Sequence, residues 1–69
     1  MKLFVEHIKG YMVVFSSVKK INIGKIDNKN YLFIEKYSSC ENDKIKLSDI
    51  RLAFLVDTET MKEYFRYEK

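Results

Sequence analysis

Alternating polar and apolar positions predict two adjacent strands in the middle of the chain. Ile21 to Ile26 and Tyr31 to Tyr37 are rich in β-branched and aromatic residues. The polar run Asp27-Asn28-Lys29-Asn30 between them favours a turn, because Asp and Asn accept left-handed backbone conformations. We therefore predict a hairpin over these segments.

A polar loop around Cys40 separates this hairpin from a second group of strands. Lys44 to Leu47 alternates as a short strand. Ser48-Asp49-Ile50 then breaks the alternation, which indicates a tight turn or a single 3₁₀ turn. Arg51 to Val56 is typical of an apolar strand that leads toward the end of the chain.

The last segment is compatible with two structures. Thr60 and Glu63 stand at the spacing of a capping box, so a helix over 58–68 is one alternative. Threonine and aromatic residues favour a strand instead. We favour a hairpin with a loop at Asp57 to Met61, a returning strand at Lys62 to Tyr67, and Phe54 and Phe65 on one face.

The first stretch is equally open. Apolar residues recur at helical spacing, and Gly10 falls where a two-turn helix would stop. However, Phe4-Val5 and Met12 to Phe15 are β-prone, and a hairpin turning near Lys9-Gly10 fits almost as well. We expect strand from Met12 onward and favour a short helix over residues 1–9, with strand as the alternative.

These elements predict a mainly β domain that occupies residues 1–69. Five or six short strands are too few for two sheets with separate cores, so we expect a small antiparallel sheet curved into an SH3-like or Sm-like barrel. Gly24 fits this prediction, since a glycine inside a strand often marks the bend that a barrel corner needs. The simpler interpretation is that the strand tolerates the missing side chain.

Two motifs resemble a known family. Asn30-Tyr31-Leu32-Phe33-Ile34-Glu35 and Lys46-Leu47-Ser48-Asp49-Ile50 resemble the second half of Sm-like and SH3-like barrels. Over residues 24–56 the chain is most similar to the Rof family of Rho-termination inhibitors. The resemblance implies a five-stranded barrel, often preceded by a short helix, that binds RNA or an RNA-handling protein through strand edges and loops.

Two features depart from these families. Rof-type inhibitors mimic nucleic acid with an acidic surface, whereas this chain has a net charge of +3. Gly24-Lys25-Ile26-Asp27 matches part of the pattern of RNA-binding Sm rings, but the loop behind it is too short. Neither specific activity follows from the resemblance.

The inventory of reactive side chains is small. His7 is the only histidine and Cys40 the only cysteine, so one chain can form neither a disulfide nor a Cys/His zinc site. Nucleophilic catalysis would need Ser16, Ser17 or Cys40 to be activated by His7 and oriented by an acid. We expect His7 to be a partly buried packing residue. The sequence therefore predicts a non-catalytic protein without metal or cofactor.

Location and charge narrow the expected partners. No apolar run approaches the roughly 20 residues that span a bilayer. Glu6 interrupts the first apolar residues too early for a signal peptide. We expect a cytoplasmic protein that does not enter a membrane.

The positive charge lies in residues 1–37, where it either attracts phosphate or reflects a Lys-rich composition typical of AT-rich genomes.

Tyrosines lie beside basic residues on the predicted strands. Such a basic-aromatic face binds single-stranded nucleic acid by stacking and phosphate contacts. Tyrosine and arginine are equally typical of protein interfaces, and tyrosines also cap cores with their hydroxyls in water. The candidate binding residues are Lys19, Lys20, Lys25, Lys29, Tyr31, Lys36, Tyr37, Tyr64 and Arg66.

Three functional hypotheses follow. The first is a small regulator or inhibitor that docks on a larger protein, such as a nucleic-acid-handling complex. Tiny single-domain chains without catalytic groups are typical of phage and plasmid accessory proteins, including inhibitors of host defence. The second hypothesis is direct binding of RNA or single-stranded DNA through the basic-aromatic face. The third is a structural homo-oligomer formed by pairing of exposed edge strands, such as the final one.

Overall fold

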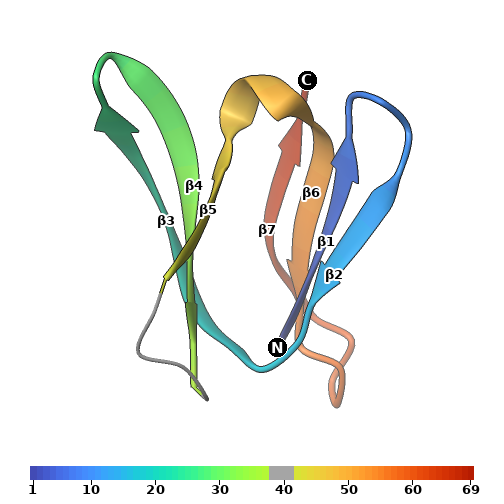
Figure 1. Cartoon of the computed structure of the whole chain (residues 1–69). Helices are drawn as coiled ribbons and strands as arrows, with labels where there is room; N and C mark the ends of the chain where they lie inside the picture. The colour runs from blue at the N-terminus through green and yellow to red at the C-terminus, as the bar shows by residue number, and fades with distance from the viewer. Residues whose placement is uncertain (38–41) are drawn as a thin grey trace.

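The computed structural model describes residues 1–37 and 42–69, and within these ranges it is mainly β (Figure 1). The prediction of a polar loop around Cys40 falls on residues 38–41, outside the described residues. The elements are β1 (Lys2–His7), β2 (Met12–Phe15), β3 (Val18–Ile26), β4 (Lys29–Lys36), β5 (Asp43–Lys46), the 3₁₀ helix η1 (Leu47–Asp49), β6 (Ile50–Val56) and β7 (Glu63–Glu68).

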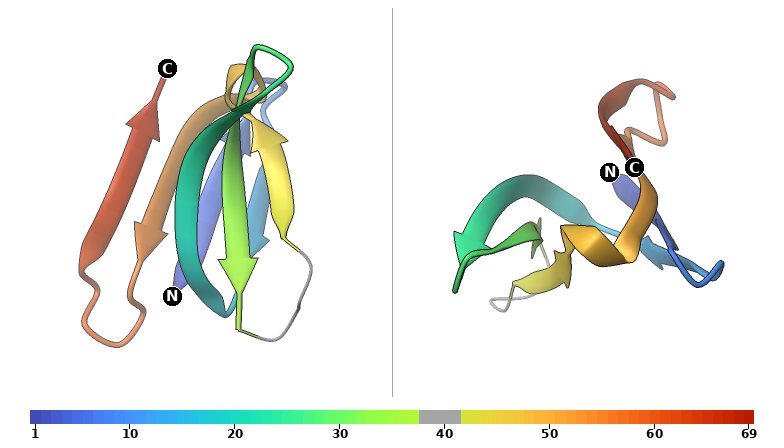
Figure 2. Two further views of the ribbon diagram at one scale, coloured as in Figure 1. Left: turned by 90° about the vertical axis from the view of Figure 1, so that its left-hand side faces the viewer. Right: turned by 90° about the horizontal axis from the view of Figure 1, so that it is seen from above.

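The strands form two antiparallel sheets. The four-stranded sheet has the order β2-β1-β6-β7 and the three-stranded sheet the order β3-β4-β5. The chain passes between the sheets from β2 to β3 and again from β5 through η1 to β6, so the sheets face each other (Figures 1 and 2). The predicted single closed barrel of five or six strands is therefore wrong in detail, although the mainly β class is confirmed.

One apolar core lies between the two sheets. The four-stranded sheet contributes Leu3, Val5, Ile50, Ala53 and Leu55, and these residues are almost completely buried. The three-stranded sheet completes the core with Val18, Leu32 and Ile34. Two sheets can coexist in so short a chain because they share this core rather than each building its own.

The β3–β4 hairpin confirms the predicted pairing with a shorter turn. Only Asp27 and Asn28 lie in the turn, with φ of 50° and 65°, while Lys29 and Asn30 already belong to β4. Positive φ at both central residues defines a type I′ turn, whose twist matches that of the flanking strands. The Asp-Asn pair fits because both residues tolerate this conformation.

The helix favoured for residues 1–9 is wrong, and the alternative hairpin is confirmed. β1 pairs with β2 on one side and with β6 on the other. Its residues therefore alternate between the core and the outside, with Leu3 and Val5 buried. Gly10 has a φ of 98°, and the Gly10 amide donates to the His7 carbonyl oxygen over 2.8 Å, closing the turn.

The favoured C-terminal hairpin is confirmed by β6 and β7. Asp57 Oδ1 accepts hydrogen bonds from the amides of Glu59 (2.9 Å) and Thr60 (3.4 Å), which shapes the loop. The prediction that Phe54 and Phe65 share a face is wrong. Phe65 lies opposite Leu55, because a bulge between Leu55 and Val56 shifts the register by one residue.

The predictions for residues 44–56 hold, and Gly24 has a different role from the one expected. β5, η1 and β6 match the short strand, the 3₁₀ turn and the apolar strand. The irregularity in β3 falls between Val18 and Lys20 rather than at Gly24. A Cβ atom at Gly24 would lie 3.0 Å from Cε2 of Phe33, so this glycine makes room for an aromatic ring.

Candidate functional site

The outer face of the three-stranded sheet gathers aromatic and basic side chains. Leu32 and Ile34 of β4 point into the core, so the intervening residues of β4 point outward. Directly opposite residues on neighbouring strands share a face. The register therefore places on this face Lys20, Asn22, Gly24 and Ile26 of β3, Lys29, Tyr31, Phe33 and Glu35 of β4, and Lys44 and Lys46 of β5.

We call these residues the basic platform, and Figure 2 (left) shows the three strands that carry it turned toward the viewer. Tyr31 and Phe33 form its centre, with ring centroids 6.1 Å apart and planes inclined by 41°. Lys44 Nζ lies 5.4 Å from the Tyr31 ring centroid, within cation–π range. The platform thus has two half-buried rings with a cation above one of them.

Positive charge dominates the basic platform. It holds four lysines against a single acid, Glu35. Glu35 lies 3.6 Å from Lys20 Nζ in an exposed ion pair, which contributes little to stability in water. Lys44 and Lys46 lie opposite the two rings on β5, and Lys29 lies on β4 itself. The platform therefore combines two stacking surfaces with a row of cations along one side.

The structure brings together only some of the candidates named from the sequence. Lys20, Lys29 and Tyr31 lie on the basic platform. Lys25 faces the other side of β3, opposite Asn30, and Lys19 falls in the irregular stretch of that strand.

The other four candidates also lie off the platform. Lys36 is a core-side residue of β4, where its ammonium lies 2.6 Å from Asp43 Oδ2 and 5.5 Å from the Phe15 ring centroid. Tyr37 follows β4, while Tyr64 and Arg66 belong to β7 in the other sheet. The nine candidate residues therefore do not share one face of the structure.

Sequence reasoning missed Phe33, Lys44 and Lys46. Only tyrosines were considered as exposed rings, although the position of Phe33 two residues after Tyr31 places both rings on one face of a strand. The two lysines carried no such local signal. They join the platform only because β5 pairs with β4.

The outer face of the four-stranded sheet has a different character. Phe4 and Phe54 stack there with centroids 5.0 Å apart, and the Arg66 guanidinium carbon lies 5.3 Å from the Phe54 centroid. Arg66 also contacts Glu63 (2.6 Å) and Glu68 (3.1 Å). Hydrogen bonding from Arg66 holds the pKa of Glu63 below its usual value, and the same bond raises the pKa of Arg66.

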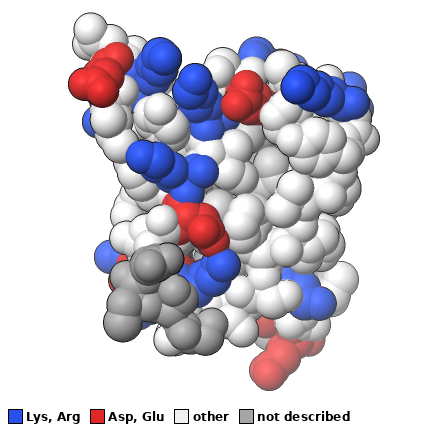
Figure 3. Space-filling model, viewed as in Figure 1, with Lys and Arg blue, Asp and Glu red and all other residues white. Residues whose placement is uncertain are grey.

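Half of the large apolar residues that are exposed in the described part of the chain lie on the β1–β2 hairpin, and the others are scattered. The hairpin residues are Ile8, Tyr11, Met12, Val13 and Val14. Figure 3 shows an uncharged area on the right of the view, where β2 lies, with charged side chains gathered around its margins.

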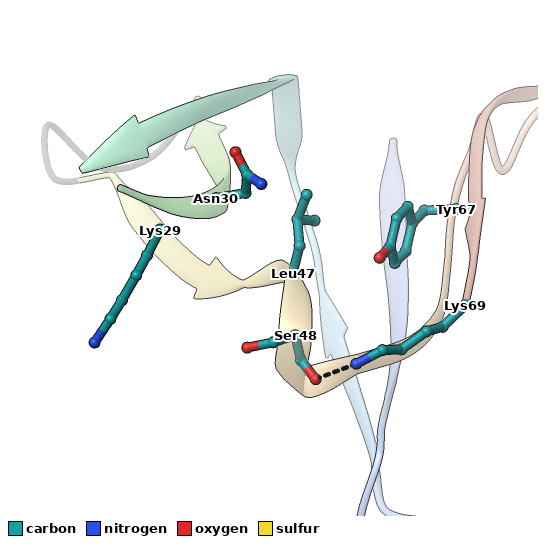
Figure 4. Close-up of a pocket in the computed structure, with 6 residues that line it drawn as sticks. All are labelled: Lys29, Asn30, Leu47, Ser48, Tyr67 and Lys69. Carbon is teal, nitrogen blue, oxygen red and sulfur yellow. Dashed lines mark hydrogen bonds between the residues drawn. The ribbon is translucent and has the colours of Figure 1, made fainter. Parts of the chain in front are cut away.

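A hollow of about 330 Å³ opens between the two sheets at the end of the basic platform (Figure 4). It is lined by Lys29, Asn30, Leu47, Ser48, Tyr67 and Lys69. Lys69 Nζ donates a hydrogen bond to the Ser48 carbonyl oxygen over 2.7 Å. Lys29 belongs to both the hollow and the platform, so the two features are continuous.

His7 lies at the end of β1, next to the turn of the β1–β2 hairpin. His7 stacks on Tyr11 with centroids 4.5 Å apart, and its Nδ1 accepts a hydrogen bond from the Lys9 amide over 3.1 Å. Among residues 1–37 and 42–69, no three His, Cys, Asp or Glu side chains are grouped to hold a metal ion. No helix within these residues is long and apolar enough to cross a membrane.

No family model matches the sequence, and neither a curated protein nor a solved structure matches the chain. The resemblance to Sm-like and Rof-type barrels therefore stays a prediction, and the functional argument rests on the surfaces described above.

Proposed function

We propose that this protein binds single-stranded nucleic acid on the basic platform and acts by binding, without a catalytic step. The observation that carries the proposal is the pair Tyr31 and Phe33 at the centre of a sheet face, with Lys44 and Lys46 opposite them on β5. Bases stack on exposed rings, and lysines beside them meet the phosphates. This arrangement supports RNA or single-stranded DNA as the ligand class.

The geometry favours unpaired nucleotides over a duplex. The two rings are parts of a sheet face and can be reached only by bases whose own faces are free. Neighbouring strands lie about 4.8 Å apart, so Lys44 and Lys46 stand one strand away from the rings. A strand that lies across β4 therefore contacts rings and cations at the same time.

Labelled oligonucleotides test this proposal directly. We expect a single-stranded oligonucleotide of about 12 nucleotides to bind at about 50 mM salt. Its affinity should fall as the salt concentration rises, because phosphate contacts release counterions. A duplex of equal length should bind less well. Fluorescence anisotropy with oligo-U and oligo-dT separates RNA from DNA. Absence of single-strand binding at low salt would contradict the proposal.

Variants of the rings test the stacking contribution. Tyr31→Leu and Phe33→Leu keep apolar bulk but remove the aromatic face, and each should weaken binding on the order of 10-fold, since stacking contributes ~1–3 kcal/mol per base. Tyr64→Leu, on the exposed side of β7, is the matched control and should leave affinity unchanged. An equal loss of affinity in all three variants would contradict binding on the basic platform.

Variants of the lysines test the phosphate contribution. Lys44→Gln and Lys46→Gln should each flatten the dependence of log affinity on log salt by about 0.7, the value expected for one phosphate contact to a single strand. Lys25→Gln removes a charge from the other side of β3 and is the control. A slope that depends on Lys25 as strongly as on Lys44 would contradict the assignment.

A second candidate function is regulation or inhibition of a larger protein. It is supported by the outer face of the four-stranded sheet, where the Phe4–Phe54 stack and Arg66 combine residue types that dominate protein interfaces. Pull-downs from the source cell with wild type, Phe54→Lys and the control Ile23→Lys test it. We expect the wild type and Ile23→Lys to capture the same partner and Phe54→Lys to lose it. If all three proteins capture the partner, the face around Phe54 is not its binding site.

A further inference from the structure

The terminal strands of the two sheets differ in how they are guarded against pairing with another chain. β3 carries Lys19, Lys20 and Lys25. Two more terminal strands are also charged. β5 carries Asp43, Lys44 and Lys46, and β7 carries Glu63, Arg66 and Glu68. Charged side chains, lysine above all, are the usual means by which proteins prevent edge-to-edge association. The fourth terminal strand, β2, has none of them.

β2 lies within an uncharged stretch that runs from Gly10 to Val18. Its side chains are apolar on both faces of the sheet. Met12 and Val14 point outward and are 53% and 47% exposed, whereas Val13 points toward the core side and is still 36% exposed. A strand that is apolar on both faces is typical of one with covered faces and a neighbour on each side. Among the described residues, β2 has a paired neighbour only in β1.

We propose that the free edge of β2 pairs in antiparallel fashion with β2 of a second copy of this chain. The two four-stranded sheets would then form one continuous sheet of eight strands around a two-fold axis. An isologous contact of this kind needs a surface that is complementary to itself. The inference does not depend on nucleic-acid binding, because the basic platform lies on the other sheet.

The composition of β2 identifies a second copy as the occupant. A strand added at this edge must bring apolar residues to both faces and no charge, and β2 itself meets both requirements. With the two-fold axis at Val13, Val13 lies opposite its symmetry mate and Met12 lies opposite Val14. Shifting the axis to Val14 places Val13 opposite Phe15. Neither register brings like charges together, whereas a self-pairing of β3 centred on Asn22 would place Lys19 opposite Lys25.

Solution mass over a concentration series tests the proposal. We expect sedimentation or light scattering of the wild type to give twice the mass of one chain at high concentration. Val14→Lys should raise the dimer dissociation constant on the order of 100-fold, because it places a charge in each half of an apolar interface. Ile23→Lys makes the same kind of change at a 54% exposed position on β3 and should leave the dimer intact.

Hydrogen exchange provides the second readout and guards against a variant that fails to fold. Amides of residues 12–15 of the wild type should gain protection as concentration rises, while those of β3 should not. Met12→Lys, at the neighbouring exposed position, repeats the test if Val14→Lys shows no sheet signal in circular dichroism. A wild type that is monomeric at about 1 mM overturns the proposal. So does a dimer that Ile23→Lys disrupts and Val14→Lys does not, or a β2 edge occupied by a different protein.

Discussion

Gly24 and Phe33 show how one missing side chain shapes the basic platform. A glycine inside a strand costs roughly 0.5–1 kcal/mol relative to alanine. The ring of Phe33 approaches so closely that a Cβ at position 24 would lie 3.0 Å from Cε2. The glycine therefore sets where the ring lies, and the ring covers backbone that Gly24 leaves open.

Gly24→Ala should separate the stability of the protein from its binding. The new methyl group has to displace the Phe33 ring, while the alanine recovers part of the conformational cost of glycine. We expect the free energy of unfolding in urea to change by less than about 1 kcal/mol and the affinity for an oligonucleotide to fall. If the ring moves, as NMR would show, and affinity is unchanged, Phe33 is not part of the binding surface.

At the scale of single residues, the sequence indicated only that basic and aromatic side chains lie in and beside the hairpin. Tyr31, Lys20 and Lys29 are among the residues named on that basis, but so are Lys19 and Lys25, which the register places elsewhere. Alternation along β4 puts Lys36 on the core side, beside Asp43. Lys44 was not predictable, because its position beside Tyr31 depends on the register between β4 and β5.

The β3–β4 hairpin is held in register by its two-residue turn. Asn28 has a φ of 65°, a conformation that costs most residues about 1 kcal/mol or more and costs glycine nothing. The register of this turn determines which residues of β3 lie opposite Tyr31 and Phe33. A change at Asn28 thus acts on the element that builds the basic platform.

Substitutions at Asn28 should move stability in opposite directions. Asn28→Gly should raise the free energy of unfolding by a few tenths of a kcal/mol up to about 1, because glycine adopts positive φ without strain. Asn28→Ala should lower it by about 1 kcal/mol, since alanine has no side chain that favours the left-handed region. Urea unfolding followed by circular dichroism measures both. Equal stability of the two variants would argue against a type I′ turn.

Whole elements were predictable when short-range pattern and pairing agree. The two hairpins β3–β4 and β6–β7 pair neighbouring segments, and both were expected. β1 was misassigned because its apolar residues also fit a helical stripe, and its strand conformation depends on pairing with β6 far along the chain. The bulge next to Val56 similarly reversed the expected sharing of a face by Phe54 and Phe65.

At the scale of the molecule, the two sheets present different chemistry on their outer faces. The three-stranded sheet carries the basic platform, and the four-stranded sheet carries the Phe4–Phe54 stack and the uncharged edge of β2. The split into two sheets could not be predicted from local pattern, because it depends on which strands separated in sequence become neighbours. Leu3 opposite Leu55 is one such pair.

The central place of β1 between β2 and β6 also dictates the order in which the protein can assemble on the ribosome. The three-stranded sheet involves contacts between segments that emerge one after another, so little loop entropy opposes it. β1 is synthesised before β6, so it lacks one of its two neighbours until Val56 has emerged. Throughout that interval the most apolar hairpin of the nascent chain waits with two open edges, the state in which association with other chains or capture by a chaperone competes with folding.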